Sequence, residues 1–280
     1  MTRFGGHCDL CGYAPAPRIA ACVGNSRWAS TVARGRIPQA AAVIIGNEVL
    51  SGKTKDTNSY YLARTLFDQG VRFARIETIP DLIDDISSTV RRLSSSFDYV
   101  FTSGGIGCTH DDITYEAIRQ AFGLSLEVHH PTVETMRAYY ASRGVKLNSA
   151  HMRMATLPYP ADKIISTPGL WVPAVQVRNV FILPGIPSLF ESMVKSILAQ
   201  LDCGTGKFHR LSLNLAVGES EIADCLAEVQ SEFPTVEIGS YPKLSQGDPP
   251  SYTTQLCFTS RDQQLARDAV AAFESRFKHI

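Results

Sequence analysis

The part of the sequence that decides the fold is residues 99–112, which read YVFTSGGIGCTHDD. Residues 99–102 are aromatic or β-branched, which is the composition of a short buried strand. This run continues without a break into the glycine-rich residues 103–107, and two aspartates follow. Because ligands of open α/β sheets bind at the carboxyl ends of the strands, the arrangement predicts a ligand-binding loop at a sheet edge.

The residues before this stretch repeat a pattern of an apolar strand followed by an amphipathic helix. Residues 40–45 are continuously apolar, as in a strand buried on both faces, and residues 73–79 predict the next strand. The helix between them has Thr57 as its predicted cap and ends at Gly70. A second helix has apolar side chains at helical spacing, namely Ile83, Ile86, Val90 and Leu93. The chain is therefore expected to be an α/β protein with a mostly parallel sheet and helices on both faces.

The pattern continues on the other side of the glycine-rich stretch. Helices are predicted to begin near Asp111 and after Pro131. Two strands within residues 171–183 are predicted to meet at residues 178–179. Ser188 is the predicted cap of the helix that follows them.

The rhythm of the sequence changes after the Gly-Thr-Gly of residues 204–206. Strands and helices then alternate in the manner of a small α+β unit, so the sequence predicts a boundary at residue 206. The predicted organisation is a leader at residues 1–38, an α/β domain at residues 39–205 and a small α+β domain at residues 206–280. In the last domain, strands are expected at 208–217, 236–241 and 252–259, and helices at 219–233 and 262–277.

The first 38 residues differ in charge from the rest of the chain. They contain five arginines, and Asp9 is the acidic residue among them. Such an arginine-rich, acid-poor segment is typical of a mitochondrial transit peptide, and a disordered leader is the alternative. Both a mitochondrial and a cytoplasmic location are therefore left open. Cys8 and Cys11, with Cys22 nearby, lack the second ligand pair that a structural zinc site needs.

Composition limits the classes of partner. The chain has 280 residues, of which 44% are hydrophobic, and its 27 basic residues balance 27 acidic ones. A net charge of zero argues against nucleic acid or an anionic membrane surface as the partner. No apolar run approaches the roughly 20 residues that span a bilayer. A small-molecule partner is therefore expected.

Two polar loops are predicted to meet at the sheet edge. In a parallel sheet, the loops after the first and third strands emerge at the same edge. Glycine amides can approach an anionic group closely, and nearby carboxylates can hold a hard cation that neutralises phosphate oxygens. The combination predicts a phosphate or pyrophosphate site. Its polar residues are Glu48, Asp56 and Asn58 in the first loop, and Gly104, Gly105, Gly107, Thr109, Asp111 and Asp112 in the other.

Each of these features also has a purely structural explanation. Thr109 and Asp112 have the spacing of a capping pattern, and aspartates in a first helical turn are favoured by the helix dipole alone. Pro184 and Gly185 are first of all a sharp connection from strand to helix, and second a wall for a ligand. The loop from Gly46 resembles a Walker loop, but five residues separate its glycines where that motif requires four.

At these positions the sequence resembles the MoaB/Mog-type molybdopterin-binding domain family. Within that family it is most similar to the CinA-like branch and to the N-terminal region of eukaryotic FAD synthase. The resemblance rests on residues 102–117 (TSGGIGCTHDDITYEA), 55–58 (KDTN) and 177–187 (VRNVFILPGIP). Residues 233–234 and 238–242 resemble the segment that follows this domain in FAD synthases.

The resemblance implies two activities: binding of molybdopterin, and metal-dependent cleavage of a nucleotide pyrophosphate such as FAD or ADP-ribose. For the second activity, Asp111 and Asp112, helped by Glu48 or Asp56, are expected to hold a divalent cation such as Mg²⁺, Mn²⁺ or Co²⁺. The amides of residues 104–107 are expected to hold a phosphate. The full set of expected binding residues is Gly46, Asn47, Asp56, Asn58, Ser103, Gly104, Gly105, Gly107, Thr109, Pro184 and Gly185.

Two substitutions depart from the family pattern and keep a second interpretation open. Asn47 stands where the family usually has aspartate, and Cys108 stands in place of proline. Loss of one carboxylate favours a non-catalytic module that binds a flavin nucleotide or pterin. A role in molybdenum cofactor synthesis is a third interpretation, from family analogy. The sequence ends before an FMN adenylyltransferase domain, so it is not expected to make FAD. Mog-type proteins are often oligomeric, so self-association is also expected.

Overall fold

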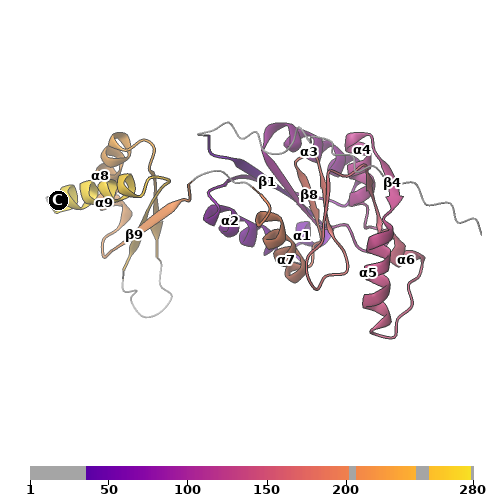
Figure 1. Ribbon diagram of the computed structural model, residues 1–280. Coiled ribbons are helices and arrows are strands. Elements are labelled where there is room, and N and C mark those ends of the chain that lie inside the picture. The colour runs from indigo at the N-terminus through magenta and orange to yellow at the C-terminus, as the bar shows by residue number, and fades with distance from the viewer. Residues whose placement is uncertain (1–35, 202–205, 244–251, 279–280) are drawn as a thin grey trace, which may run out of the picture.

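The computed structural model describes residues 36–201, 206–243 and 252–278. Its first unit is built on a six-stranded sheet with the strand order β2-β1-β3-β8-β7-β6 (Figure 1). The first four strands in this order run parallel, and β7 and β6 are antiparallel to their neighbours. The mostly parallel sheet predicted from the sequence is confirmed. The strands are β1 (Gln39–Ile45), β2 (Arg72–Ile79), β3 (Tyr99–Ser103), β6 (Lys163–Ile165), β7 (Ala174–Val177) and β8 (Val180–Leu183).

Helices cover both faces of this sheet. The side chains of β1 alternate between the two faces, so that Ala42 and Ile44 belong to one core and Val43 and Ile45 to the other. Helices α2 and α7 pack on the first core, and α3 and α4 pack on the second (Figure 1). The helices of this unit are α1 (Asn47–Leu50), α2 (Asn58–Asp68), α3 (Ile83–Ser96), α4 (Thr114–Phe122), α5 (His130–Ala141), α6 (Ser149–Arg153) and α7 (Pro187–Leu198).

The helical face predicted for α3 is confirmed. Ile86, Val90 and Leu93 are fully buried or nearly so, at spacings of four and three residues. The strands β7 and β8 meet at residues 178–179 as predicted, and Arg178 has a positive φ of 54° in the turn between them. Asn179 fixes this turn to α3, because its Nδ2 donates to the carbonyl oxygens of Ser94 and Phe97 at 2.9 and 2.8 Å.

Of the predicted helix starts, Thr57 is confirmed as the N-cap position of α2, whereas Ser188 is not the cap of α7 and α4 does not begin at Asp111. The Thr57 side chain makes no capping hydrogen bond; instead, the Asp56 carboxylate accepts the N–H groups of Asn58 and Ser59. Helix α7 has no side-chain cap at all, because it begins with Pro187, whose ring presets the helical φ. The helix predicted near Asp111 begins at Thr114, because Asp112 is held by the preceding loop.

The sequence did not predict the two-stranded antiparallel sheet that lies beside α4. It consists of β4 (Ser125–Val128) and β5 (Thr156–Tyr159), which pair antiparallel across α5 and α6. Each strand has four residues, which is too short for a clear alternation of polar and apolar side chains. Helix α1, with four residues, and strand β6, with three, are likewise too short to give a periodic pattern in the sequence.

Residues 206–243 and 252–278 form the second, α+β unit around a three-stranded antiparallel sheet with the order β10-β11-β9. Its core contains Leu256, Phe258 and Phe273, packed against Ile222 and Val229. The fold class predicted for this part of the chain is confirmed. Its elements are β9 (His209–Leu215), α8 (Glu219–Glu232), β10 (Glu237–Pro242), β11 (Thr254–Ser260) and α9 (Gln263–Phe277).

Part of the predicted leader lies outside the described residues. This applies to residues 1–35, which include Cys8, Cys11 and Cys22, so the transit-segment and zinc interpretations remain predictions. Within the part of the chain that the structure describes, none of the helices combines the length and the apolar character needed to cross a membrane.

The stacked pair of Phe101 and Phe181 tests the packing at the centre of the sheet. The two rings lie 5.1 Å apart on neighbouring strands β3 and β8, and both are fully buried. We expect Phe181→Ala to lower the free energy of unfolding by about 3–5 kcal/mol, because the deleted ring leaves a cavity. Tyr60→Ala is the control, since Tyr60 is 65% exposed and should cost less than about 0.5 kcal/mol. Urea unfolding measures both; equal effects would contradict the prediction.

Candidate functional site

The glycine-rich loop after β3 is confined between three elements. Gly104 has φ +115°, and a β-carbon at this position would lie 2.2 Å from the carbonyl oxygen of Ile45, at the end of β1. Its own N–H donates to the Leu183 carbonyl at the end of β8. Gly105 has φ +66°, and a β-carbon there would lie 2.3 Å from Oγ1 of Thr114. The loop therefore requires glycine at both positions.

Asp112 closes this loop from the inside. Its carboxylate accepts the N–H of Gly107 at 2.6 Å, the N–H of Thr109 at 2.7 Å and the Thr109 hydroxyl at 2.6 Å. A β-carbon on Gly107 would lie 2.6 Å from the same carboxylate. Asp112 can therefore occupy this position only because residue 107 has no side chain. The capping-like spacing of Thr109 and Asp112 thus stabilises the loop rather than the first turn of α4.

Asp111 is the more available of the two aspartates. It is exposed, and its carboxylate lies 2.5 Å from the Thr109 hydroxyl, whose single proton it shares with the carboxylate of Asp112. The hydrogen bond from Thr109 and one from the backbone N–H of Asp111 itself lower the pKa of the Asp111 carboxyl, and so do the nearby His110 and Arg153. Asp111 is therefore ionised at neutral pH and free to meet a cation or a substrate.

A third carboxylate at this edge, Asp81, was missed by the sequence analysis. It follows β2 and accepts the backbone N–H of Asn47 at 2.8 Å, which fixes the loop after β1. Burial raises the pKa of the Asp81 carboxyl, and so do the negative charges of Glu48 and Asp111. Glu48 after β1 and Asp111 after β3 are thus close enough to Asp81 for their negative charges to act on it. The rule that directed attention to the ends of the first and third strands would have found Asp81 at the end of the second.

Asn58 joins the loops that follow β3 and β8. Its Nδ2 donates to Ser103 Oγ and to the Gly185 carbonyl, both at 2.9 Å, and the side chain is buried. Its Oδ1 has no hydrogen-bond partner among the described residues. Gly185 in turn passes close to the glycine loop, since a β-carbon on it would lie 3.4 Å from Cα of Gly104. Buried Pro184 completes this wall.

The remaining predicted residues divide between support and the site edge. The Asp56 carboxylate is engaged by the first turn of α2, where it also accepts the Ser59 hydroxyl, so it positions Asn58. Glu48 is exposed in α1 and its carboxylate folds back over Gly46, where a β-carbon would lie 2.6 Å from Oε1. Asn47 takes part through its backbone N–H, which donates to the Asp81 carboxylate. Across the described residues, no three His, Cys, Asp or Glu side chains are already arranged to hold a metal ion.

The comparisons with known proteins agree with the motifs. Residues 41–202 match the family described as "Probable molybdopterin binding domain", and residues 207–280 match "FAD synthase, middle domain". Since the first match covers more than half of the chain, the protein belongs to this molybdopterin-binding domain family. The resemblance predicted from the sequence is confirmed.

Individual relatives support the same assignment. A protein of Archaeoglobus fulgidus is 34% identical over 232 residues, which cover 83% of this chain and 95% of that one. The "Probable FAD synthase" of Caenorhabditis elegans is 32% identical over 75% of this chain, which corresponds to 45% of its own length. The chain therefore spans less than half of that FAD synthase. The crystal structure of CinA, "with unknown function", from Thermoplasma acidophilum matches with a TM-score of 0.53 and 28% identity, covering 57% of this chain and 96% of that chain.

The confinement of the glycine loop can be tested with a matched pair of glycines. Gly104 and Gly123 both have positive φ, but a β-carbon at Gly123 would meet no atom within 4 Å. We expect Gly123→Ala to cost about 1 kcal/mol of unfolding free energy, for the left-handed backbone alone. Gly104→Ala should cost clearly more, because its β-carbon meets the backbone of β1. Thermal unfolding measures both, and equal costs would show that the loop is not confined.

The raised pKa of Asp81, caused first by burial and then by the charges of Glu48 and Asp111, predicts that the free energy of unfolding depends on pH. Because the folded-state pKa is raised, the Asp81 carboxyl contributes stability below its ordinary pKa, near pH 4, and this stability is lost as the pH rises through the folded-state pKa. Asp81→Asn keeps an acceptor for the Asn47 N–H and removes the charge. The variant should therefore be more stable than the wild type at pH 7, with a difference that shrinks below about pH 4. Urea unfolding from pH 3 to 8 checks this. Asp68→Asn, at an exposed position on α2, should show no such change.

Proposed function

We propose that this chain is a metal-dependent nucleotide pyrophosphatase that cleaves FAD or ADP-ribose into two monophosphates. The observation that carries the proposal is a set of carboxylates at the sheet edge that bears the glycine loop: Asp111 is exposed there, and Glu48 and Asp111 are close enough to Asp81 to raise the pKa of its carboxyl. Such a site joins backbone donors for phosphate to carboxylates for a cation, which are the two components that pyrophosphate chemistry requires. Water would attack one phosphorus atom, and the bridging P–O bond would break.

The glycine loop supplies the phosphate donors in this proposal. The N–H groups of Gly104 and Gly107 are already used, by the Leu183 carbonyl and by Asp112. Those of Gly105, Ile106 and Cys108 donate to no acceptor in the described part of the chain. We propose these N–H groups as the donors to the phosphate oxygens, because they lack an acceptor within the protein. They replace the set 104–107 that the sequence suggested.

The carboxylates fit a cation that is shared with the substrate. Mg²⁺ is usually bound by one or two carboxylates together with substrate phosphates, so a complete protein cage is not required. Asp111, Asp81 and Glu48 are the proposed ligands, and a bound Mg²⁺, Mn²⁺ or Co²⁺ would supply charge stabilisation on the pyrophosphate and an activated water. Relief of the repulsion at Asp81 would favour binding. Asp112 and Asp56 are proposed to position the loop and Asn58.

A second candidate is a module that binds a flavin nucleotide or a pterin without turnover. It is favoured by Asn47, which contributes a backbone N–H but no carboxylate, and by Asp112, whose oxygens are occupied by the loop. The family membership is compatible with either candidate. A homo-oligomeric state and a mitochondrial or cytoplasmic location remain predictions.

Product analysis tests the proposed activity. Incubation of the protein with FAD or ADP-ribose and Mg²⁺, Mn²⁺ or Co²⁺ should release AMP, detected by chromatography. Asp111→Ala should lower the rate by about 100-fold or more, because it removes charge stabilisation of the transition state. Asp68→Ala is the matched control, since it removes an exposed carboxylate remote from the loop.

Calorimetric titration of the same nucleotides distinguishes the two candidates. Metal-dependent binding without AMP would support the binding module and overturn the pyrophosphatase. Full activity in Asp111→Ala would exclude the proposed carboxylate site even if AMP is formed.

A further inference from the structure

The end of the glycine loop is contacted by a distant segment of the chain, which contains the short helix α6. Nη2 of Arg153, the last residue of α6, donates to the backbone carbonyl of Asp112 at 3.4 Å. Arg153 is exposed, and its charge is close enough to Asp111 to lower the pKa of that carboxyl. The tertiary structure therefore brings a guanidinium to the loop from a residue 41 positions away from Asp112 in the sequence.

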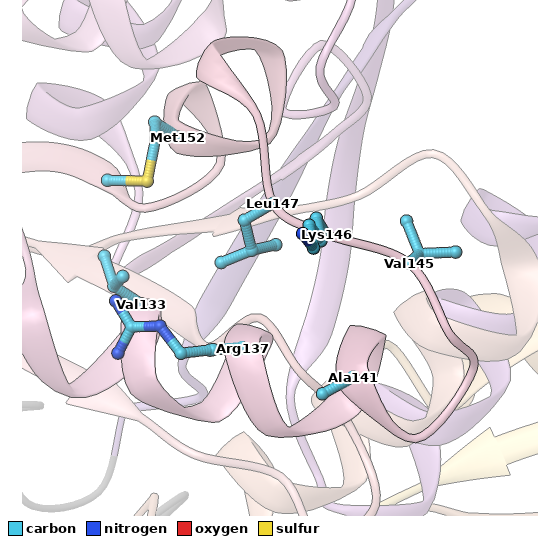
Figure 2. Close-up of a pocket in the computed structure, with 7 residues that line it drawn as sticks. All are labelled: Val133, Arg137, Ala141, Val145, Lys146, Leu147 and Met152. Carbon is cyan, nitrogen blue, oxygen red and sulfur yellow. The ribbon is translucent and has the colours of Figure 1, made fainter.

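The backbone that carries Arg153 is held on both sides. The side chain of Asn148 caps α6 by accepting the N–H of His151 at 3.1 Å. Met152, directly before Arg153, is partly buried against the first core and lines a hollow beside α5 (Figure 2). Met154, directly after it, is 8% exposed and belongs to the same core. Arg153 thus extends toward the loop from an anchored backbone, and little ordering is required before it can meet a ligand.

The guanidinium of Arg153 keeps most of its hydrogen-bonding capacity. A guanidinium has five N–H donors, whereas the hydrogen bond of Arg153 to the Asp112 carbonyl is long and goes to a neutral acceptor. None of the ion pairs in the described part of the chain involves Arg153. Arginine is not deprotonated in proteins, so the charge is permanent. Its planar fork matches two oxygens of one phosphate group.

The site also requires a positive charge beyond the cation proposed above. Glu48, Asp81 and Asp111, together with one divalent cation, leave no net positive charge for a pyrophosphate diester, which is negative on each phosphate. The bridging oxygen gains further negative charge while its P–O bond breaks. A fixed cation beside the loop would stabilise that charge in the transition state.

We propose that Arg153 is a catalytic residue of this site, whose guanidinium binds the pyrophosphate group of the substrate and stabilises the leaving phosphate. The proposal rests on the pyrophosphatase function proposed above, and it restricts the substrate class to pyrophosphate diesters with both phosphates charged. The oxygen of water bonds to one phosphorus atom, the bridging P–O bond breaks, and its electron pair stays on the bridging oxygen. One proton of the water remains on the new P–OH group, and the other passes to solvent.

Variants of residue 153 test the catalytic role by release of AMP from ADP-ribose with Mg²⁺. Arg153→Gln should lower kcat/KM about 100-fold, and Arg153→Lys should recover part of this loss, because it keeps the charge without the fork. Added guanidinium, far below the concentration that unfolds the protein, should restore part of the rate of Arg153→Gln; a purely structural role would not allow this rescue. Arg267→Gln removes an exposed arginine of α9 and is the matched control.

Binding measurements test Arg153 separately from turnover. The probe is α,β-methylene-ADP with Mg²⁺, because its P–C–P bridge cannot be hydrolysed. By calorimetry, Arg153→Gln should raise the Kd of this probe about tenfold and leave the Kd of adenosine unchanged. Binding of Mn²⁺ alone should be as tight as in the wild type or tighter, since the substitution removes a positive charge near Asp111.

The outcomes separate the two proposals. If the wild type releases no AMP and Arg153→Gln still weakens the probe about tenfold, the pyrophosphatase proposal fails and the role of Arg153 in pyrophosphate binding stands. The Arg153 proposal is overturned if the wild type does not bind the probe, or if Arg153→Gln behaves like Arg267→Gln in both assays. It is also overturned if Arg153→Gln loses Mn²⁺ together with the probe, because the substitution would then have disrupted the loop.

Discussion

The close approach of the glycine loop to the ends of β1 and β8 is the constraint on which the site depends. Parallel pairing of β1 with β3, and of β3 with β8, brings three carboxyl ends to one edge. Gly104 passes against the carbonyl of Ile45 and donates to that of Leu183. With no side chain at Gly104, the loop packs directly against the ends of β1 and β8. The sheet therefore places the loop, and the loop places the polar groups.

The acidic residues at this edge divide into two kinds. The carboxylates of Asp112 and Asp56 accept hydrogen bonds from nearby N–H and hydroxyl groups. These bonds hold the glycine loop and the first turn of α2 in place. Asp111 and Glu48 are exposed, and their negative charges add to burial in raising the pKa of the Asp81 carboxyl. A protein retains such repulsion most readily where a cation or a ligand compensates it. The division explains why neighbouring aspartates in one motif need not share a role.

The two units of the chain have separate cores. The three-stranded unit buries Phe258 and Phe273 in its own interior, and none of the residues proposed for catalysis comes from it. The α/β unit holds the edge site. The segment of this unit that contains β4, α5, α6 and β5 is where the sequence was least informative.

The sequence by itself determined the α/β class, the main strands and helices, and the importance of residues 99–112. Continuous apolar runs and helical spacing are local signals. A glycine-rich loop after a strand indicates a ligand-binding edge in any parallel sheet. Only the tertiary structure decided which aspartates are free. Whether the carboxylate of Asp112 or Asp56 faces a ligand or a backbone N–H depends on how the loop folds back, and the spacing of residues does not encode this. Asp81 is likewise brought beside Asn47 by segments 34 residues apart in sequence, since long-range packing sets which side chains become neighbours.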